Sequence, residues 1–155
     1  MTEHYLQLNP GKTEIIIFGT KKVLSELEIN GVFLKSSVCI RTVQVAKNLG
    51  FLLDSNLRLD PQIKKLKASV CHKLRNISKM RPFLSENQLQ IITQALVISS
   101  LDYCNALYIG ANQSILKQLQ NLQNRAARVI KGLKRKDHVE PYMEELHWLK
   151  VKERV

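Results

Sequence analysis

The chain has 155 residues, of which 45% are hydrophobic and 24% are charged, and these ordinary proportions exclude disorder over most of its length. Its formal net charge of +11 is unusual, and it bears on binding partners rather than on fold. Nucleic acid is the first candidate partner, an anionic membrane surface is the second, and a role in solubility alone is the third. No apolar run approaches the roughly 18 residues of a membrane span.

Cysteine usage bears on metal binding and on the cellular compartment. Cys39, Cys71 and Cys104 are widely spaced and form no CxxC pair, so we expect buried thiols rather than a zinc site. An odd number of cysteines and the lack of a secretory signal are typical of a reducing compartment. The sequence therefore predicts an intracellular protein of the nucleus or cytoplasm.

The excess positive charge is concentrated in the second part of the chain. Residues 1–59 carry seven Lys or Arg against five Asp or Glu, whereas residues 60–155 carry seventeen against eight. The hydrophobic pattern changes at the same point, from strand-like runs to helical periodicity. We therefore predict two domains, 1–59 and 60–155. The predicted fold class is α+β, with a small antiparallel β region at about 12–54 and an all-α helical bundle at about 60–148.

Strand signals separated by turn residues mark the first domain. Apolar or β-branched runs predict strands at Thr13–Phe18, Val38–Val45 and Leu49–Leu53. Asn30-Gly31 predicts a hairpin turn, because both residues tolerate positive φ. Gly50 interrupts the last run, and a Gly inside a strand often marks the close approach of another backbone or a ligand.

The second domain opens with a helix whose outer face carries only positive charge. Asp60 suits the N-cap and Pro61 suits the first helical position. Apolar residues recur on one face, at Ile63, Leu66, Val70, Leu74 and Ile77. The opposite face holds Lys64, Lys65, His72, Arg75 and Lys79. No acidic residue lies between Asp60 and Glu86, although a solvated helix usually mixes signs to form paired contacts, so this pattern favours an anionic partner.

The next helix is predicted to be the buried centre of the bundle. A capping-box pattern begins at Ser85. Between residues 87 and 116 the only charged residue is Asp102, so we expect this helix to be buried on all sides. Tyr103 and Tyr108 could stack on bases, but in so apolar a segment we assign them to the core.

A third long helix is predicted to begin after a cap at Ser114. Its packing seam consists of Ile115, Leu119, Leu122, Ala126, Val129 and Leu133. Lys117, Arg128 and Lys131 point away from that seam. The basic cluster at residues 131–136 exceeds what complementation of the helix dipole requires. A last short helix is predicted from about Pro141 to His147.

The sequence holds no catalytic constellation. It lacks GxSxG, a P-loop, HExxH and a Gly-rich dinucleotide turn. Glu144 and His147 have i, i+3 spacing without a second such pair, and nothing pairs Asp54 and Asp60 to hold two metal ions. The residues alone therefore predict a basic β-then-α module that binds a polyanion and catalyses nothing by itself.

Six segments, in order and over essentially the whole chain, resemble the reverse transcriptases of non-LTR (LINE-type) retrotransposons. Residues 8–19 resemble the Asn-x-x-Lys-Thr-Glu segment that follows the catalytic hairpin of that family. Asn48 to Asp54 resembles its primer-grip motif. Its thumb segments are similar to residues 75–85, 95–108, 119–130 and 146–149. Lys150 departs from the family, because many relatives have Pro after Trp-Leu.

The resemblance implies that this chain lacks the polymerase metal site. In that family two Mg²⁺ ions are held by palm aspartates, among them an Asp-Asp hairpin, and this chain has no Asp-Asp pair. The fingers and the metal-binding palm would then be a missing upstream part, so we expect no metal, no cofactor and no polymerase activity from this chain alone. By resemblance Lys12 matches a lysine proposed to assist proton transfer to pyrophosphate, and Asn48, Leu49 and Gly50 match the primer grip.

Charge and resemblance together predict one function. The chain would be a fragment of an RNA-directed DNA polymerase that holds an RNA or DNA primer–template duplex through backbone phosphates, without reading bases. The predicted contacts are Lys64, Lys65, Arg75, Lys79, Lys117, Arg128, Lys131, Lys134, Arg135 and Lys136. The alternative is a decayed element that serves as a structural or protein-interaction module without binding nucleic acid.

Overall fold

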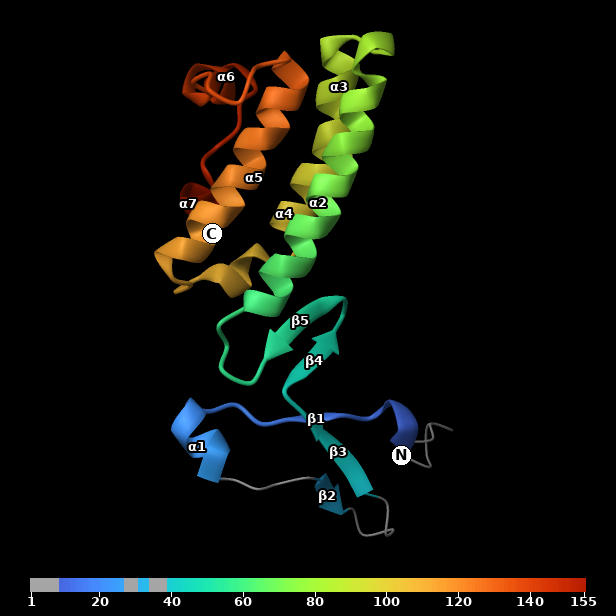
Figure 1. Ribbon diagram of the computed structural model, residues 1–155, viewed down its shortest axis with the longest axis vertical. Helices are drawn as coiled ribbons and strands as arrows, with labels where there is room; N and C mark the ends of the chain where they lie inside the picture. Colours follow the sequence, from blue (N-terminus) through green and yellow to red (C-terminus); the bar gives the residue numbers. More distant parts are fainter. Residues whose placement is uncertain (1–8, 27–30, 34–38) are drawn as a thin grey trace, which may run out of the picture. The chain divides into compact units, whose positions relative to one another are not determined.

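The computed structural model describes residues 9–26, 31–33 and 39–155, in a mixed α and β fold (Figure 1). The chain divides into two compact units, Met1–Gln62 and Ile63–Val155. The change in charge and periodicity predicted a domain boundary between residues 59 and 60.

A three-stranded sheet and a hairpin make up the β-rich unit, together with the short helix α1 (Lys21–Glu26). Its strands are β1 (Ile15–Ile16), β2 (Gly31–Phe33), β3 (Cys39–Val43), β4 (Val45–Asn48) and β5 (Phe51–Asp54). The three-stranded sheet has the order β1-β3-β2, in which β2 is antiparallel and β1 is parallel to β3. The prediction of an antiparallel region is therefore wrong for the β1–β3 pair. Parallel pairing needs a long crossover connection, and the connection from β1 contains α1, which the sequence analysis missed.

The hairpin of β4 and β5 closes through a two-residue turn at Leu49 and Gly50. Asn48 pairs with Phe51, and the φ angles of Leu49 and Gly50 are 46° and 90°. Positive φ at both central residues defines the turn that matches strand twist in a tight hairpin. Gly50 thus lies in the turn and not inside a strand, and a Cβ built on it meets nothing within 4 Å. Within this chain, Gly50 is required by its backbone angle and not by close packing. The other predicted turn, at Asn30-Gly31, lies partly outside the described residues.

Asp54 and Gln62 fix the junction at which α2 (Asp60–Met80) begins. The carboxylate of Asp54 accepts hydrogen bonds from the backbone N–H of Arg58 at 3.0 Å and of Leu59 at 2.7 Å. The side-chain oxygen of Gln62 accepts one from the N–H of Leu52 at 3.0 Å. Asp54 is buried, and its two backbone partners assign it a structural role in this turn.

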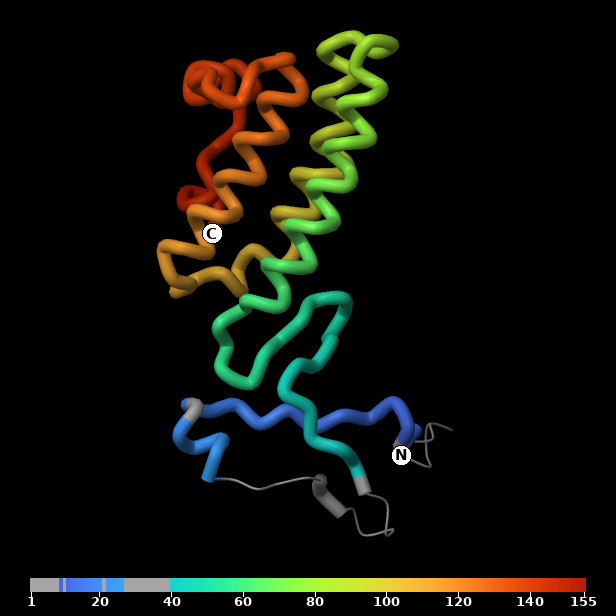
Figure 2. Tube along the Cα trace, in the orientation of Figure 1, coloured from blue at the N-terminus to red at the C-terminus, as the bar shows by residue number. Residues whose placement is uncertain are grey.

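Three helical rods form the core of the second unit. The rods are α2, the segment containing α3 (Glu86–Thr93) and α4 (Ser99–Asp102), and α5 (Gln113–Lys131). The predicted apolar face of α2 is buried, with Val70 fully inaccessible. Along the Cα trace, α2 and α5 run in the same direction, and a segment containing the 3₁₀ turn Asn105–Tyr108 crosses one end of the bundle between α4 and α5 (Figure 2).

The middle rod is only half buried, contrary to the prediction. Ser85 does form a capping box with Gln88. Five residues of the rod are buried, namely Leu89, Thr93, Val97, Ile98 and Leu101. Ile91 and Leu96, however, are 60% and 46% exposed. A π turn at Gln94–Ile98 connects α3 to α4. Its wider turn keeps Leu89, Thr93 and Val97, which are four residues apart, on the same buried side of the rod. Of the two tyrosines assigned to the core, Tyr108 is buried and Tyr103 is half exposed.

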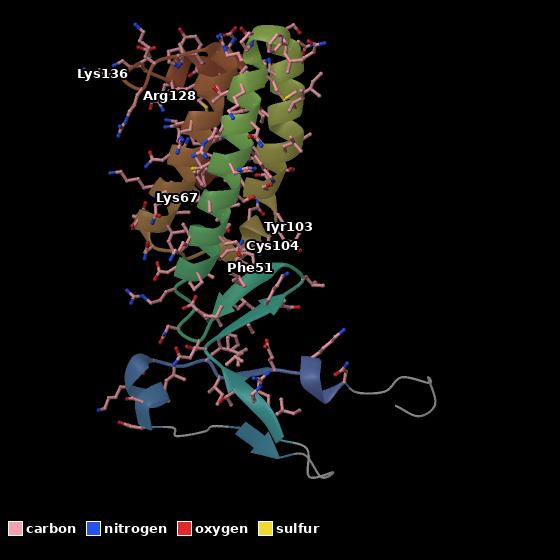
Figure 3. All side chains as sticks on the ribbon, turned by 45° about the vertical axis from the view of Figure 1, so that its right-hand side comes forward. Phe51, Lys67, Tyr103, Cys104, Arg128 and Lys136 are labelled. Atoms are coloured by element: carbon pink, nitrogen blue, oxygen red, sulfur yellow. The ribbon has the colours of Figure 1, made fainter. Side chains whose placement is uncertain are left out.

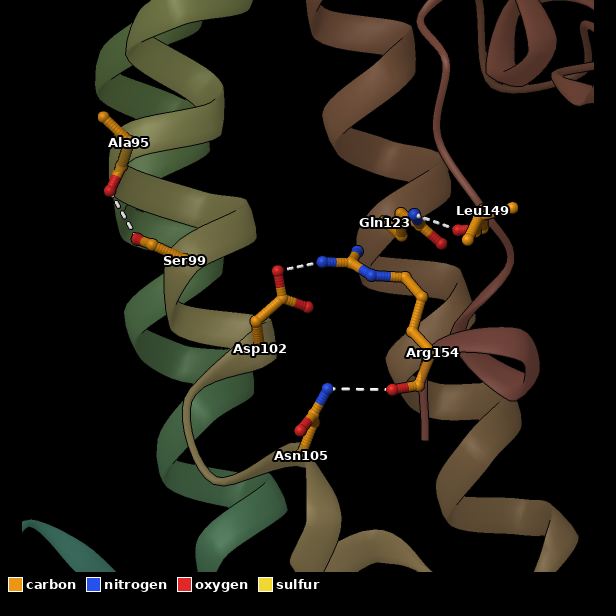
Figure 4. A network of polar contacts seen from close by, with 7 residues as sticks. All are labelled: Ala95, Ser99, Asp102, Asn105, Gln123, Leu149 and Arg154. Atoms are coloured by element: carbon orange, nitrogen blue, oxygen red, sulfur yellow. Dashed lines mark hydrogen bonds and ion pairs between the residues drawn. The ribbon is translucent and has the colours of Figure 1, made fainter.

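Polar contacts hold the end of the chain against α4 and α5, as Figure 4 shows. This end contains α6 (Glu140–Glu145) and α7 (Val151–Arg154), the latter unpredicted. The fully buried Gln123 donates to the carbonyl of Leu149 at 2.9 Å. Arg154 pairs with Asp102, and its carbonyl accepts a hydrogen bond from Asn105 at 2.9 Å.

The ends of α5 are fixed by an asparagine and a glycine. Asn112, and not the predicted Ser114, is the N-cap, since its side chain accepts from the N–H of Ile115 at 2.9 Å. Gly132 ends the helix with φ of 67°, the left-handed geometry that favours glycine.

Candidate nucleic-acid interface

A groove lies between α2 and α5 in the helical unit, and we call it the α2–α5 groove. It consists of two adjoining hollows of about 800 Å³ and 320 Å³ that share Arg125 and Val129. Its remaining lining residues are Lys67, Cys71, Leu74, Arg75, Ser78 and Lys79, from α2, with Gln118, Asn121, Leu122, Arg128 and Arg135. Leu74 and Leu122 are buried and form an apolar floor.

The walls of the groove are cationic. None of the lining residues is acidic, and six are cationic, namely Lys67, Arg75, Lys79, Arg125, Arg128 and Arg135. All six are exposed except Arg128, which is half-buried. Convergent cations without a carboxylate create a positive potential that attracts anions.

Four of the predicted contact residues line this groove, and two of its cations were missed. Arg75, Lys79, Arg128 and Arg135 were predicted, whereas Lys67 and Arg125 were not. At about 100° per residue, Lys67 lies about 20° from Leu74, at the edge of the apolar face. The predicted cations lie opposite that face, but the groove uses the flank that meets α5. The absence of acidic residues from 61 to 85 was a signal for Lys67 on α2, and α5, which also lacks acidic residues, gave the same signal for Arg125.

Arg125 and Arg128 are held in place by neighbours that leave their charge available. Nη1 of Arg125 donates to the thiol Sγ of Cys71 across the groove, at 3.0 Å. Nη2 of Arg128 donates to the carbonyl of Asp137 at 3.2 Å. The Nε of Arg128 is buried and has no hydrogen-bond partner among the described residues. Neither contact neutralises a guanidinium, so both remain competent to bind an anion.

Lys131, by contrast, has its charge neutralised within the fold. Its Nζ lies 2.5 Å from a carboxylate oxygen of Glu86 and 2.5 Å from one of Glu145. Hydrogen bonds to Glu145 and Glu86 raise the pKa of Lys131 above its usual value. The ammonium also lies 5.9 Å from the ring centroid of Tyr142, and the side chain is only 8% exposed. We therefore leave Lys131 out of the proposed contact surface.

The rest of the basic cluster follows α5 in a loop ordered by Asp137. The carboxylate of Asp137 accepts from the backbone N–H of Lys134 at 2.6 Å. Lys136 lines a further cavity of about 380 Å³ with Arg128, where Asp137 and Glu140 offset part of the positive charge. Figure 3 shows Lys67, Arg128 and Lys136 on one side of the helical unit and Tyr103 with Cys104 on the other.

The remaining predicted residues lie outside the groove. Lys64, Lys65 and Lys117 are exposed on α2 and α5 but do not line it. In the β-rich unit, Lys12 is exposed at the end of the 3₁₀ turn Pro10–Lys12. The primer-grip-like residues form the tip of the β4–β5 hairpin, where Leu49 is 84% exposed.

Among residues 9–26, 31–33 and 39–155, no three His, Cys, Asp or Glu side chains lie close enough together to hold a metal ion. The helices in these same ranges include none that is both long and apolar enough to cross a membrane.

Comparisons with protein-family models, with curated proteins and with solved structures found no match to this chain.

Proposed function

We propose that this chain is the primer-grip and thumb portion of a non-LTR retrotransposon reverse transcriptase, and that its helical unit holds a primer–template duplex by its phosphates. The observation that carries the proposal is the α2–α5 groove, with six cations and no carboxylate among its lining residues. In this proposal α2, the α3–α4 rod and α5 form the thumb.

The chemistry of the groove suits a phosphate backbone better than bases. Four of its cations are arginines, whose planar forks match phosphate oxygens in pairs. Gln118, Asn121 and Ser78 add neutral hydrogen-bonding groups that suit phosphate or sugar oxygens. The lining residues include no aromatic ring on which a base would stack. Such a surface binds nucleic acid without strong sequence preference.

The β4–β5 hairpin supplies the primer-grip part of the proposal. Its turn places Leu49 and Gly50 at an exposed tip, with no side chain at Gly50 to keep a ligand from the backbone. Polymerase chemistry is not assigned to this chain. The family's Mg²⁺ site does not fit the described residues, because no cluster of three metal-ligating side chains occurs among them.

The test measures the binding of a primer–template duplex by fluorescence anisotropy at several salt concentrations. Each phosphate contact contributes a slope of about −0.9 to the plot of log affinity against log salt, so six contacts predict a slope of about −5. Duplexes of unrelated sequence are expected to bind within about threefold of one another, since no base is read. Absent binding, or binding that salt does not weaken, would refute the proposal.

One observation favours the alternative, a structural or protein-interaction module. The α3–α4 rod and the segment after it expose large apolar side chains, including Ile91, Leu96, Leu107 and Ile109. Exposed apolar surface is typical of protein contacts. In this alternative the same titration shows no duplex binding, and a variant that lacks a groove arginine gives the same result as the original chain.

A further inference from the structure

We infer that the α2–α5 groove receives one strand of a duplex, over at most about five phosphates, and does not bridge the two strands. This inference rests on the proposed function and specifies how the duplex is held. It follows from the shape and length of the groove and from the direction of its cations.

The shape of the site indicates what can enter it. Arg125 spans the groove near its middle, where its Nη1 lies 3.0 Å from Sγ of Cys71 on the opposite wall, so a strand in the groove would lie over this guanidinium. The convex ridges of a duplex are its two sugar–phosphate backbones, whereas its major and minor grooves are concave. A concave trough therefore accepts a single ridge. Bridging two strands across a duplex groove would instead require a convex rib of protein with cations on both sides.

The two walls also face the same space. Lys67 on α2 lines the larger hollow with Arg125 on α5, and Arg75 on α2 lines the smaller hollow with the same Arg125. Cations from both helices therefore converge on one path. A single strand lying in this path would meet cations from both sides along its length.

The length of the path sets the number of phosphates. At about 1.5 Å per residue, α2 rises about 18 Å from Lys67 to Lys79. On the other wall, α5 rises about 15 Å from Gln118 to Arg128. One strand of a duplex advances about 3.4 Å along the axis per phosphate, and its backbone winds around that axis, so the groove holds at most about five phosphates of one strand. The six cations are therefore at least as many as the phosphates of that stretch.

The experiment compares three duplexes of one sequence with the complete chain. The first has ordinary phosphates on both strands, the second has neutral methylphosphonates throughout one strand, and the third has them on both. If the groove follows one strand, the half-neutral duplex keeps all of its phosphate contacts on its charged strand. The coefficient per contact falls from about 0.9 to about 0.7 at the charge density of a single strand, so the magnitude of the slope decreases only by about a fifth.

The outcomes separate the inference from the proposed function. A half-neutral duplex whose slope falls by more than half in magnitude, because half of its contacts are gone, would overturn the single-strand inference while the proposed function stands. Failure of the fully charged duplex to bind would remove both. The fully neutral duplex is expected not to bind; if it binds as well as the charged one, phosphates are not the ligand and both ideas fail.

Discussion

The guanidinium of Arg125 reaches from α5 to α2, where Nη1 lies 3.0 Å from the thiol sulfur of Cys71. A thiol is a weak, uncharged acceptor, so this contact orients the guanidinium without neutralising it. A carboxylate at the same position would have formed an internal ion pair, as Glu86 and Glu145 do with Lys131. The fold therefore holds one arginine in place at the centre of the α2–α5 groove and leaves its charge available.

Replacing this arginine tests the groove directly. Arg125→Gln removes one phosphate contact, so we expect duplex affinity to fall roughly tenfold at 0.1 M salt and the salt slope to decrease by about 0.9. The loss should be similar on all sequences. Anisotropy titrations at four or more salt concentrations measure both quantities, and circular dichroism checks that the variant remains folded.

Two control variants accompany Arg125→Gln. Lys152→Gln makes the same change in net charge at an exposed site on α7 that does not line the groove. Cys71→Ser keeps an acceptor opposite Arg125, and its binding should match that of the original chain. If Lys152→Gln weakens binding as much as Arg125→Gln, net charge and not the groove is responsible.

Local patterns in the sequence predicted the three long helical segments and the buried face of α2 well. The three- and four-residue spacing places Ile63, Val70 and Leu74 in the core, and Ser85 forms its capping box. These features depend on contacts between residues close in sequence. The parallel pairing of β1 with β3 and the π turn at Gln94–Ile98 depend on distant partners, so no local pattern specified them.

The candidate site was predictable only in part, for a related reason. The absence of carboxylates along α2 indicated an anion-binding helix, but which flank faces the groove depends on how α5 packs. Lys131 shows the same limit in reverse. Its partners Glu86 and Glu145 lie 45 and 14 residues away, so no local pattern indicated that its charge is neutralised.

The pairing of Lys131 predicts a pH dependence of stability. Hydrogen bonds to Glu145 and Glu86 raise the folded-state pKa of Lys131 above its usual value. The stabilisation is therefore fully present below the ordinary lysine pKa of about 10.4 and is lost as pH rises through the higher folded pKa. Lys131→Met should lower the free energy of unfolding at pH 7 by about 1 kcal/mol, which is a few degrees in Tm.

Thermal unfolding between pH 7 and pH 12 measures this effect. Above about pH 10.4 the Tm of the original chain should fall towards that of Lys131→Met, until the two curves of Tm against pH meet. Lys134→Met replaces an exposed lysine of the same cluster and should leave stability nearly unchanged at pH 7. A constant gap between the original chain and Lys131→Met through pH 12 would show that the ion pairs do not cause the difference.

Gly132 predicts a second stability effect, at the end of α5. Its φ of 67° disfavours any residue with a Cβ, and a Cβ there would also meet the guanidinium of Arg81. The arginine side chain is flexible and can move aside, so the backbone term should dominate. Gly132→Ala is expected to cost about 1–2 kcal/mol and Gly132→Asn less, because Asn tolerates left-handed geometry.

Urea unfolding of these variants, with and without Arg81→Ala, separates the two contributions. If the backbone dominates, Gly132→Ala costs nearly the same in either background. A cost that disappears when Arg81 is shortened would instead assign the effect to the side-chain clash. The Gly132 variants, once folded, are expected to bind the duplex as the original chain does, because Gly132 does not line the groove.

Leu49 has a strained backbone angle and lies at the tip of the hairpin that is proposed as the primer grip. It has φ of 46° and is 84% exposed, although Asn is the residue that suits this turn position and leucine gains nothing there from burial. A residue that violates a local rule without a packing gain indicates a functional site. Leu49→Asn should therefore stabilise the β4–β5 hairpin by about 1 kcal/mol, measured by amide hydrogen exchange in β4 and β5.

The same change should weaken binding to a recessed primer end. We expect Leu49→Asn to lower affinity for a duplex with a recessed 3′ end by threefold or more, with little change for a blunt duplex, because an apolar contact at the hairpin tip is lost. Leu57→Asn is the matched control, since Leu57 is also exposed and has φ of 52° but lies outside the hairpin. If both variants stabilise their turns and neither distinguishes the two duplexes, then the strain at Leu49 has no part in holding a primer end.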